Sequence, residues 1–574
     1  MNWNVGNKDS VIVDCISKDL AISPALAFLL INLGLDASES ACRFLKPKLE
    51  HLSDPFEVSN LKLGVERLSK AIDAKEKVFI FGDYDVDGIT SIVQLVSILR
   101  RYHFDPSYFV PLRLSEGYGL TKEAIDRALN GGVPDLMIVV DCGTNSKESI
   151  DYLYGLGVSV IIIDHHQQST EPLDQGILIN PHVNDPQGEA QGWFNLSASG
   201  LVFKFLHGFI KYRREQNDAL AQSIRLSQII DLAGMGTIAD LVPLHGENRI
   251  LSWYGLRHLQ SNKRLGIMTL LRESNVEAGQ LLNGSDISYR IAPRINACGR
   301  LGDASLPVEL LLSEDRGFAQ KTAKKLDTIN TERQSIERAI TEEAEVAIQK
   351  DSLERLGFVL SSEEWHPGVV GIVASRVSRK FNKPCIVLGR EGELAKGSGR
   401  SILGVNLVSV IEPCNDLLNT WGGHPMAVGL SLPWEDRHLL QEAFEKNLAL
   451  LYPDGFPEPQ LEIACWLEAH ELNEALLNDL STLQPYGQNN PEPVFGLKGI
   501  VFNKAAKQFG KTHKRFFLPL ENEKNEPIEG IAWNTDKMPI VGEPVDLAFR
   551  LEWNFWRNKK TFRLTLVDWK QSLN

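Results

Sequence analysis

The stretch that decides the fold is Val78-Phe-Ile-Phe-Gly-Asp-Tyr-Asp-Val-Asp-Gly88. Its apolar start predicts a buried strand, and the acids follow that strand directly. A helical pattern then runs from about Ile89 to about Tyr102, which puts the acids at the carboxyl end of a strand, where open α/β sheets hold their ligands. Alternate carboxylates in an extended segment project to one side and repel one another unless a cation lies between them. The stretch therefore predicts a cation site at the edge of a sheet.

Two further apolar runs end in side chains that bind metals. Leu136 to Val140 precedes Asp141, and Val160 to Ile163 precedes Asp164-His165-His166. Because parallel strands bring their carboxyl ends to one edge, we expect these groups to meet the first three acids there. Asp231, which precedes Leu-Ala-Gly-Met-Gly-Thr-Ile-Ala-Asp240, is expected to join them. Carboxylate and imidazole together suit Mn²⁺ and tolerate Mg²⁺ or Zn²⁺.

Each pattern also has a simpler explanation. Asp-Gly is a common turn dipeptide, Asp141 fits a helix N-cap equally well, and Asp231 is compatible with an ordinary helix or loop acid. A calcium loop of the D-x-D-x-D-G type is excluded, because a strand precedes it and the twelfth residue is Gln94 instead of Glu. The four groups in combination favour a metal site.

Composition sets limits on the partners. The chain has 574 residues and a net charge of -14, so a nucleic-acid partner must be met by local basic patches. Its seven cysteines lack paired C-x-x-C spacing, which predicts reduced thiols in a reducing compartment. No signal-peptide pattern and no apolar run of membrane-spanning length is present, so we expect a cytoplasmic protein with no membrane partner, and a monomer.

Strand and helix patterns divide the chain into five parts, of which two are α/β domains. We predict a helical N-terminal extension packed on the first domain (residues 1–55), a parallel-sheet α/β domain (56–312), one or two long linking helices (313–350), a smaller α/β domain (351–455) and a β-rich C-terminal domain in the form of a small barrel or sandwich (456–574).

The C-terminal part carries basic residues among aromatic ones. The first cluster contains Lys498, Lys504, Lys507, Lys511, Lys514 and Arg515 with Phe502, Phe509, Phe516 and Phe517, and the second contains Arg557, Lys559, Lys560 and Arg563 with Trp553, Phe555, Trp556 and Phe562. Such interleaving is typical of OB-type barrels that bind single-stranded nucleic acid. The simpler alternative is that the rings fill the barrel core and the charges are only solvated.

In order and combination, the motifs resemble the DHH phosphoesterase superfamily. These are Asp-x-Asp-x-Asp-Gly, the strand-end Asp141, Asp-His-His, and Asp-Leu-Ala-x-x-Gly-Thr-x-Ala-Asp. Arg294-Ile-Asn-Ala-Cys-Gly-Arg300, Gly397-Ser-Gly-Arg-Ser401 and Gly422-Gly-His424 resemble the RecJ branch, the 5′-to-3′ exonucleases of single-stranded DNA. The resemblance implies a parallel-sheet DHH domain, a long linking helix, a DHH-associated domain and an OB-like barrel. It also implies a role in recombination and repair, beside a single-strand-binding protein and a helicase.

The resemblance also implies roles for individual residues. Two divalent ions, Mn²⁺ or Mg²⁺, would be held by Asp85, Asp87, Asp141, His165 and Asp231, with Asp83, Asp164 and His166 close by as catalytic or further metal-binding groups. The substrate phosphate would be bound by Arg113, Arg294, Arg300, Ser398, Arg400, Gly423 and His424. A Gly-rich turn with an arginine suits this task, because backbone N–H groups approach the phosphate and the guanidinium adds a fork.

The sequence departs from the family pattern at one position. Many relatives carry a histidine two residues before the first acid of the triplet, where this chain has Phe81. We expect the second ion to be bound more weakly or to depend on Asp83. A DHH-type phosphatase or oligonucleotide hydrolase acting on small nucleotides is the alternative function, although it would not need the basic and aromatic C-terminal part.

Overall fold

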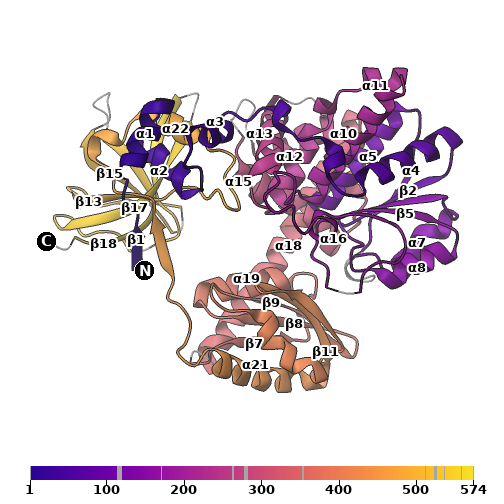
Figure 1. The fold of residues 1–574 in the computed structure, drawn as a ribbon. Coiled ribbons are helices and arrows are strands. Elements are labelled where there is room, and N and C mark those ends of the chain that lie inside the picture. Colours follow the sequence, from indigo (N-terminus) through magenta and orange to yellow (C-terminus); the bar gives the residue numbers. More distant parts are fainter. Residues whose placement is uncertain are drawn as a thin grey trace.

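A computed structural model describes residues 2–8, 10–112, 119–169, 171–261, 264–276, 282–351, 354–510, 512–521, 527–535, 537–556 and 559–572. The fold consists of two α/β units, a long helix between them and a C-terminal β unit (Figure 1). The predicted fold class is confirmed, and the exact domain boundaries stay predictions. No described helix is long and apolar enough to cross a membrane.

The first unit is built around a parallel sheet in the order β3-β2-β4-β5-β6. Its strands are β2 (Val78–Gly82), β3 (Ser107–Phe109), β4 (Leu136–Val140), β5 (Ser159–Ile163) and β6 (Ile177–Ile179). The central strands β2 and β4 are buried along their whole length, as their unbroken apolar sequences require. Because β2, β4 and β5 run parallel as neighbours, the residues that follow them leave the sheet at one edge.

Helices cover the first sheet. They are α4 (Leu61–Ala74), α5 (Val86–Arg101), α7 (Lys122–Ala128), α8 (Lys147–Gly155), α9 (Pro181–Asn184), α10 (Ala198–Glu215), α11 (Ala219–Ser223), α12 (Ile230–Ala239), α13 (Gly246–Ser261), α14 (Leu265–Glu273), α15 (Gly284–Asp286), α16 (Ala292–Leu301) and α17 (Leu306–Leu312). One hydrophobic cluster joins α4, α5, α10 and α12, and a second joins α7 and α8 on the other side of the strands. Helix α5 packs against both α10 and α12 in the first cluster.

Helix α18 (Arg316–Asp351) links the two α/β units as a single helix, where the sequence predicted one or two linking helices over residues 313–350. Its first half contributes Ala319, Ala323 and Leu326 to the core of the first unit. Its second half contributes Ile340, Ala344 and Ile348 to a cluster that includes α19 of the second unit. The linker is therefore part of both cores.

The second unit has a sheet in the order β10-β11-β9-β8-β7. Its elements are β7 (Phe358–Ser362), α19 (Val370–Phe381), β8 (Cys385–Glu391), β9 (Leu394–Arg400), α20 (Leu407–Ile411), β10 (Thr420–His424), β11 (Ala427–Pro433) and α21 (Arg437–Leu451). Only β7 and β8 pair in parallel, and the remaining strands are antiparallel.

The C-terminal unit is a six-stranded sheet in the order β13-β17-β18-β16-β15-β14. Its elements are β12 (Gln460–Ile463), α22 (Glu474–Thr482), β13 (Phe495–Val501), β14 (Lys507–Phe509), β15 (His513–Glu521), β16 (Pro527–Ala532), β17 (Pro544–Trp556) and β18 (Lys559–Gln571). Phe495, Phe502, Phe516, Phe549 and Phe562 lie in its core.

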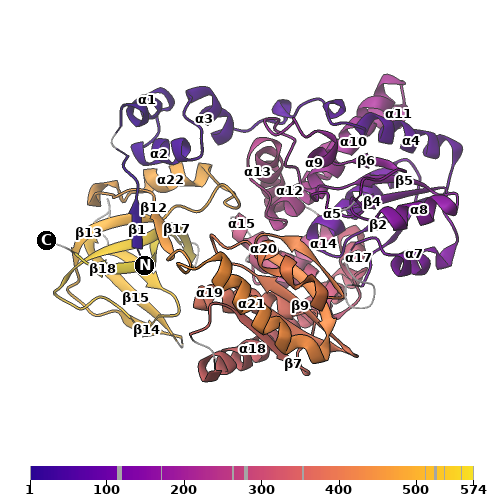
Figure 2. The same cartoon turned by 60° about the horizontal axis from the view of Figure 1, so that its bottom comes forward.

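The N-terminal extension contains β1 (Asn2–Val5), α1 (Val11–Leu20), α2 (Pro24–Asn32) and α3 (Ser38–Leu45). The prediction that it packs on the first domain is wrong for β1, α1 and α2, whereas Phe44 of α3 does contact Arg249 of the first unit. Strand β1 pairs with β12, and Val13, Leu26 and Leu30 share a core with the C-terminal unit (Figure 2). The reason is that the apolar face of α22 is available to cover α2, which is apolar on nearly all sides.

A buried ion pair fixes the segment after α3 to the first unit. Lys204 Nζ on α10 lies 2.8 Å from Glu247 Oε1 on α13, and both side chains are almost fully buried. Ser53 joins them, because its hydroxyl accepts from Lys204 and donates to Glu247. Removing one partner of a buried ion pair is strongly destabilising, because the other charge stays buried without its partner.

We expect Lys204→Met to lower the free energy of unfolding by about 3–5 kcal/mol, because Glu247 is left charged and buried. The double variant Lys204→Met/Glu247→Leu should recover most of this loss. Denaturant unfolding followed by circular dichroism measures both. A loss below about 1 kcal/mol in the single variant, the value of an exposed pair, would contradict the account.

Candidate metal centre

The turn between β2 and α5 is shaped by its own acids. Asp85 is the N-cap of α5, and its carboxylate accepts from the backbone N–H groups of Asp87 and Gly88 at 2.9 and 3.2 Å. A Cβ atom at position 88 would lie 2.4 Å from the carbonyl oxygen of Asp83, so the turn closes only with glycine there. Asn296 on α16 accepts from Val86 N–H and holds the start of the helix.

Asp87 is fully buried in the first turn of α5. Its two oxygens accept from the backbone N–H groups of Ala198 (2.7 Å) and Ser199 (3.0 Å) at the start of α10. Burial and repulsion from Asp85 raise the pKa of Asp87 to about 7, although these N–H groups oppose the rise. The α10 amides therefore fix the direction of the carboxylate without neutralising it.

The acids that follow β4 and β5, Asp141 and Asp164, have pKa values shifted in opposite directions. Asp141 has a left-handed backbone (φ 61°), and burial with the nearby Asp85 and Asp87 raises its pKa well above the usual value. Asp164 accepts from the N–H groups of Thr144, His165 and His166, and from His166 Nδ1 at 2.7 Å. Burial opposes its charge, but the His166 ring outweighs burial and lowers the pKa of Asp164. Asp164 thus orients its loop.

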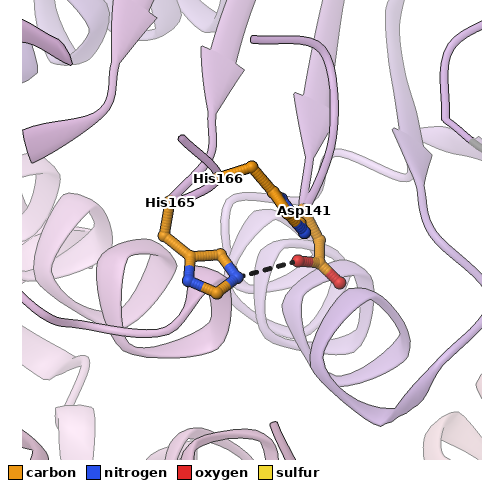
Figure 3. Close-up of side chains that lie close together, drawn as sticks. All are labelled: Asp141, His165 and His166. Atoms are coloured by element: carbon orange, nitrogen blue, oxygen red, sulfur yellow. Dashed lines mark ion pairs between the residues drawn. The ribbon is translucent and has the colours of Figure 1, made fainter. Parts of the chain in front are cut away.

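The side chains at this edge form three groups whose metal-binding atoms lie within 4.8 Å of one another. The groups are Asp87 with His165 and Asp240, Asp83 with Asp85 and Asp141, and Asp141 with His165 and His166. Asp141 belongs to two of them, and Figure 3 shows its carboxylate pointing toward His165 beside the His166 ring. The residues fit two neighbouring cations with Asp141 between them.

His165 gives the clearest sign that the cluster fits a cation. Its Nε2 lies 3.5 Å from both Asp141 Oδ1 and Asp240 Oδ2, and 3.9 Å from Asp87 Oδ2. Burial, with a smaller effect of His166, lowers the pKa of His165 to about 3, so the ring is neutral and its nitrogen is free to coordinate a metal. Within the described part of the chain, neither this nitrogen nor Asp240 Oδ2 has a hydrogen-bonding partner. A cation would satisfy both.

His166 stands at the open side of the cluster. Its ring is partly exposed, and the Asp164 carboxylate outweighs burial and raises the pKa of His166 to about 9. Phe81 is buried and stacks on Phe109 with 5.6 Å between ring centroids, so it offers no ligand. Asp83 lies with Asp85 and Asp141, where the sequence predicted that it would compensate for Phe81.

Asp231 is not in the cluster, and Asp240 takes the place predicted for it. Asp231 lies in the first turn of α12 and binds Arg264, with Nε 2.9 Å from Oδ2. Asp240 lies at the other end of α12, about 14 Å along the helix axis for nine residues. Only one of the two acids can therefore reach the β2, β4 and β5 ends.

A sequence signal for Asp240 exists in the glycines before it. A Cβ atom on Gly236 would lie 2.4 Å from Ser199 Cβ and 2.7 Å from Asp87 Oδ1, so α12 approaches the buried acid only because this residue is glycine. The pattern Gly-Met-Gly-Thr-Ile-Ala-Asp240 thus indicates a helix pressed against the cluster with an acid at its end.

A second polar site lies on the sheet of the second unit. The segment Gly397 to Arg400 is part of β9, not the glycine-rich turn expected from the sequence. Strand β11 lies between β9 and β10, so that Ser398 and Gly422 both pair with Gly429, and Arg400 and His424 both pair with Ala427. Arg400 Nη1 donates to Ser398 Oγ at 2.6 Å, and burial with the Arg400 charge lowers the pKa of His424. Gly371 at the start of α19 faces Ser398 and Arg400, so N–H groups and a guanidinium converge there.

Three arginines were predicted as phosphate contacts of the first unit. Arg300 Nη1 donates to Gly368 O at 2.8 Å, just before α19, and so connects the first unit to the second polar site. Arg294 binds Asp327 on α18, which is a structural contact. Arg113 lies outside the described residues.

Family models match three parts of the chain: DHH family, N-terminal domain (residues 77–237), DHHA1 domain (355–450) and RecJ OB domain (463–568). The single-stranded-DNA-specific exonuclease RecJ of Bacillus subtilis is 33% identical over 99% of this chain and 70% of its own length. The RecJ protein of Salmonella typhimurium is 32% identical over 95% of this chain and 96% of its own length. The chain belongs to the RecJ family.

Solved structures agree with this assignment. RecJ from Thermus thermophilus in complex with Mn²⁺ superposes with a TM-score of 0.83 at 26% identity, over 100% of this chain and 80% of that one. The same protein with Mg²⁺ gives a TM-score of 0.78 at 25% identity, over 100% and 79%. The Asp and His cluster of this RecJ-family chain fits either of these ions chemically.

A matched pair of variants tests which end of α12 binds metal. We expect Asp240→Asn to lower Mn²⁺-dependent hydrolysis about a hundredfold or more, because a lost ligand costs several kcal/mol. Asp231→Asn should leave the Mn²⁺ titration close to that of the unchanged protein. Calorimetric titration measures Mn²⁺ binding and a nuclease assay measures hydrolysis. A larger loss in Asp231→Asn than in Asp240→Asn would show that Asp231 is the metal ligand.

Proposed function

We propose that this protein is a metal-dependent exonuclease that hydrolyses single-stranded DNA from the 5′ end and releases 5′-mononucleotides in recombination and repair. The observation that carries the proposal is the cluster in which Asp141 is shared between two sets of metal-binding atoms, in a chain of the RecJ family. The 5′ direction rests on the resemblance to that family. The small-nucleotide hydrolase is disfavoured, because the chain matches RecJ proteins over nearly its whole length.

Each part of the cluster has a role in this reaction. When bound, two divalent ions, Mn²⁺ or Mg²⁺, activate a water and stabilise the charge that develops on the phosphate. Asp83, Asp85, Asp87, Asp141, His165 and Asp240 would hold them. His166, oriented by Asp164 and partly open to solvent, is placed to pass a proton to the leaving oxygen.

The polar site of the second unit fits a terminal phosphate. We assign binding of that phosphate to Ser398, Arg400 and His424, with the start of α19 behind them. Arg300 joins this site to the metal loop, because Gly299 beside it packs on Tyr84, between Asp83 and Asp85. A phosphate held at one end and two cations at the other would favour cleavage near a strand terminus.

The aromatic residues of the C-terminal unit fall into two sets, one buried and one exposed. Phe502, Phe516 and Phe562 are buried, as the simpler explanation predicted. Phe509 is 36% exposed and Phe517 is 44% exposed, and Trp533, which the sequence analysis did not single out, is 45% exposed. Phe509 and His513 lie 5.9 and 5.0 Å from the Trp533 ring, beside the strands that carry Lys507 and Lys514. We call Phe509, His513 and Trp533 the aromatic face and propose that DNA bases stack on it.

The second basic cluster has less support. Arg563 is bound to Glu552 at 2.6 Å, which ties up its charge. Arg557 lies outside the described residues, and the side chains of Phe555, Trp556, Lys559 and Lys560 are not described. Lys511 of the first cluster also lies outside them. The proposed contact with DNA therefore depends on the aromatic face and its lysines.

We further propose a monomeric cytoplasmic protein that works with a single-strand-binding protein and a helicase. A nuclease for single strands depends on other proteins to expose and protect its substrate. The seven cysteines, all within the described residues, form no disulfide with one another.

The decisive experiment is a nuclease assay on a long single strand with a 5′ phosphate. We expect mononucleotides from that end with Mn²⁺, none with EDTA, and little hydrolysis of the matching blunt duplex. Equal hydrolysis of the duplex, or activity on small nucleotides alone, would contradict the proposal.

Arg400→Ala tests the phosphate site. We expect the guanidinium to bind the strand end equally well in the substrate complex and in the transition state. Its loss should therefore raise KM about tenfold or more while kcat changes less. A strand with a 5′ hydroxyl is the control. The assignment is wrong if Arg400→Ala leaves the preference for phosphorylated ends unchanged.

A further inference from the structure

Among the described residues, Arg249 has the largest side chain that is fully buried, at 2% exposure. It lies on α13 and its guanidinium donates to four backbone carbonyls. Nη1 donates to Leu483 O and Gln484 O at 2.8 Å, Nη2 to Thr482 O at 2.7 Å, and Nε to Phe44 O at 3.2 Å. The Phe44 ring stacks on it at 4.3 Å. We call this set the Arg249 contact.

No carboxylate takes part in the Arg249 contact among the described residues. Burial, with a smaller effect of Arg257, lowers the pKa of Arg249 to about 9, so the group still carries its charge at neutral pH. Four carbonyl dipoles replace the water around it. If the guanidinium were removed, Thr482 O and Gln484 O would lose the donor that Arg249 supplies, whereas Leu483 O would keep Asn490 Nδ2 at 2.8 Å. Burying a cation without a neighbouring carboxylate costs folding free energy. We infer that Arg249 is kept at this place because it positions the parts of the chain that it joins.

The Arg249 contact joins three parts of the chain. Arg249 belongs to the first unit, Phe44 to α3, and Thr482 to Gln484 to the end of α22 and the loop after it. In both ribbon views α3 lies between the C-terminal unit and α13 (Figures 1 and 2). The same loop is held twice more, because Leu244 N–H donates to Gln488 O at 3.0 Å and His245 Nε2 lies 2.8 Å from Asn489 O.

These contacts close the chain on itself. From the first unit the chain runs through α18 to the second unit and then to the C-terminal unit, which returns to α13. Apart from these contacts, the chain connects the C-terminal unit to the first unit by two routes, through the second unit and through the N-terminal extension with the segment after α3. A fixed second binding surface contributes more affinity than a loosely tethered one, because its effective concentration is higher.

We propose that Arg249 is a positioning residue that docks the C-terminal unit on the first unit and so holds the aromatic face at a fixed position relative to the metal centre for long strands. The proposal rests on the proposed function. It concerns the affinity for strands of different length, and not the hydrolysis step itself. Strands too short to reach the C-terminal unit gain nothing from the docking.

Arg249→Met tests the proposal by a comparison of two substrates. On a strand of about 60 nucleotides we expect KM to rise about tenfold or more, and on one of about six nucleotides, shorter than many OB-fold sites, kcat and KM should stay within about twofold. Small-angle scattering should show a larger radius of gyration. Arg213→Met is the control, because Arg213 binds Asp73 and Asp218 within the first unit and should not discriminate by length.

A double variant separates docking from general destabilisation. If Arg249 acts through the aromatic face, Phe509→Ala/Trp533→Ala should raise KM for long strands by itself and add little in the Arg249→Met background. If Arg249→Met fails to fold, Arg249→Lys replaces it, with a smaller but still length-dependent rise in KM. Equal losses on both substrates, no loss on long strands, or full additivity would overturn the proposal. A parent protein without Mn²⁺-dependent hydrolysis would instead overturn the proposed function.

Discussion

The structure depends on one electrostatic constraint, the confinement of several carboxylates in a buried space at the ends of parallel strands. Asp87 and Asp141 are almost fully buried, and Asp83 and Asp85 lie beside them. Such charges repel one another strongly where water is excluded, so the arrangement is stable only with protons or cations between them. The neutral imidazole of His165 supplies a ligand that does not add to this negative charge.

The surrounding helices hold these carboxylates in place. Helix α10 gives two N–H groups to Asp87, and α12 approaches the same acid through Gly236 to deliver Asp240. Helix α16 supports the turn through Asn296 and reaches the second unit through Arg300. The metal centre and the phosphate site are thus connected by rigid elements, which suits a reaction that requires two groups to be held at a fixed separation.

Local patterns were enough to predict the sheet edge, because apolar runs followed by acids specify both a buried strand and its end. Asp141 and His165 were found in this way. Asp240 was missed because a helix carries an acid at each end, and only the approach of α12 to Asp87 decides which one enters the cluster. The docking of α2 on α22 and the extended form of Gly397 to Arg400 depend on partners far along the chain, which no local pattern contains.

The most direct test of the account is anomalous X-ray scattering from crystals grown with Mn²⁺. The account predicts two peaks per chain about 4 Å apart, with the carboxylate of Asp141 in contact with both and Asp240 beside His165. A single peak, or two peaks of which neither contacts Asp141, would contradict it.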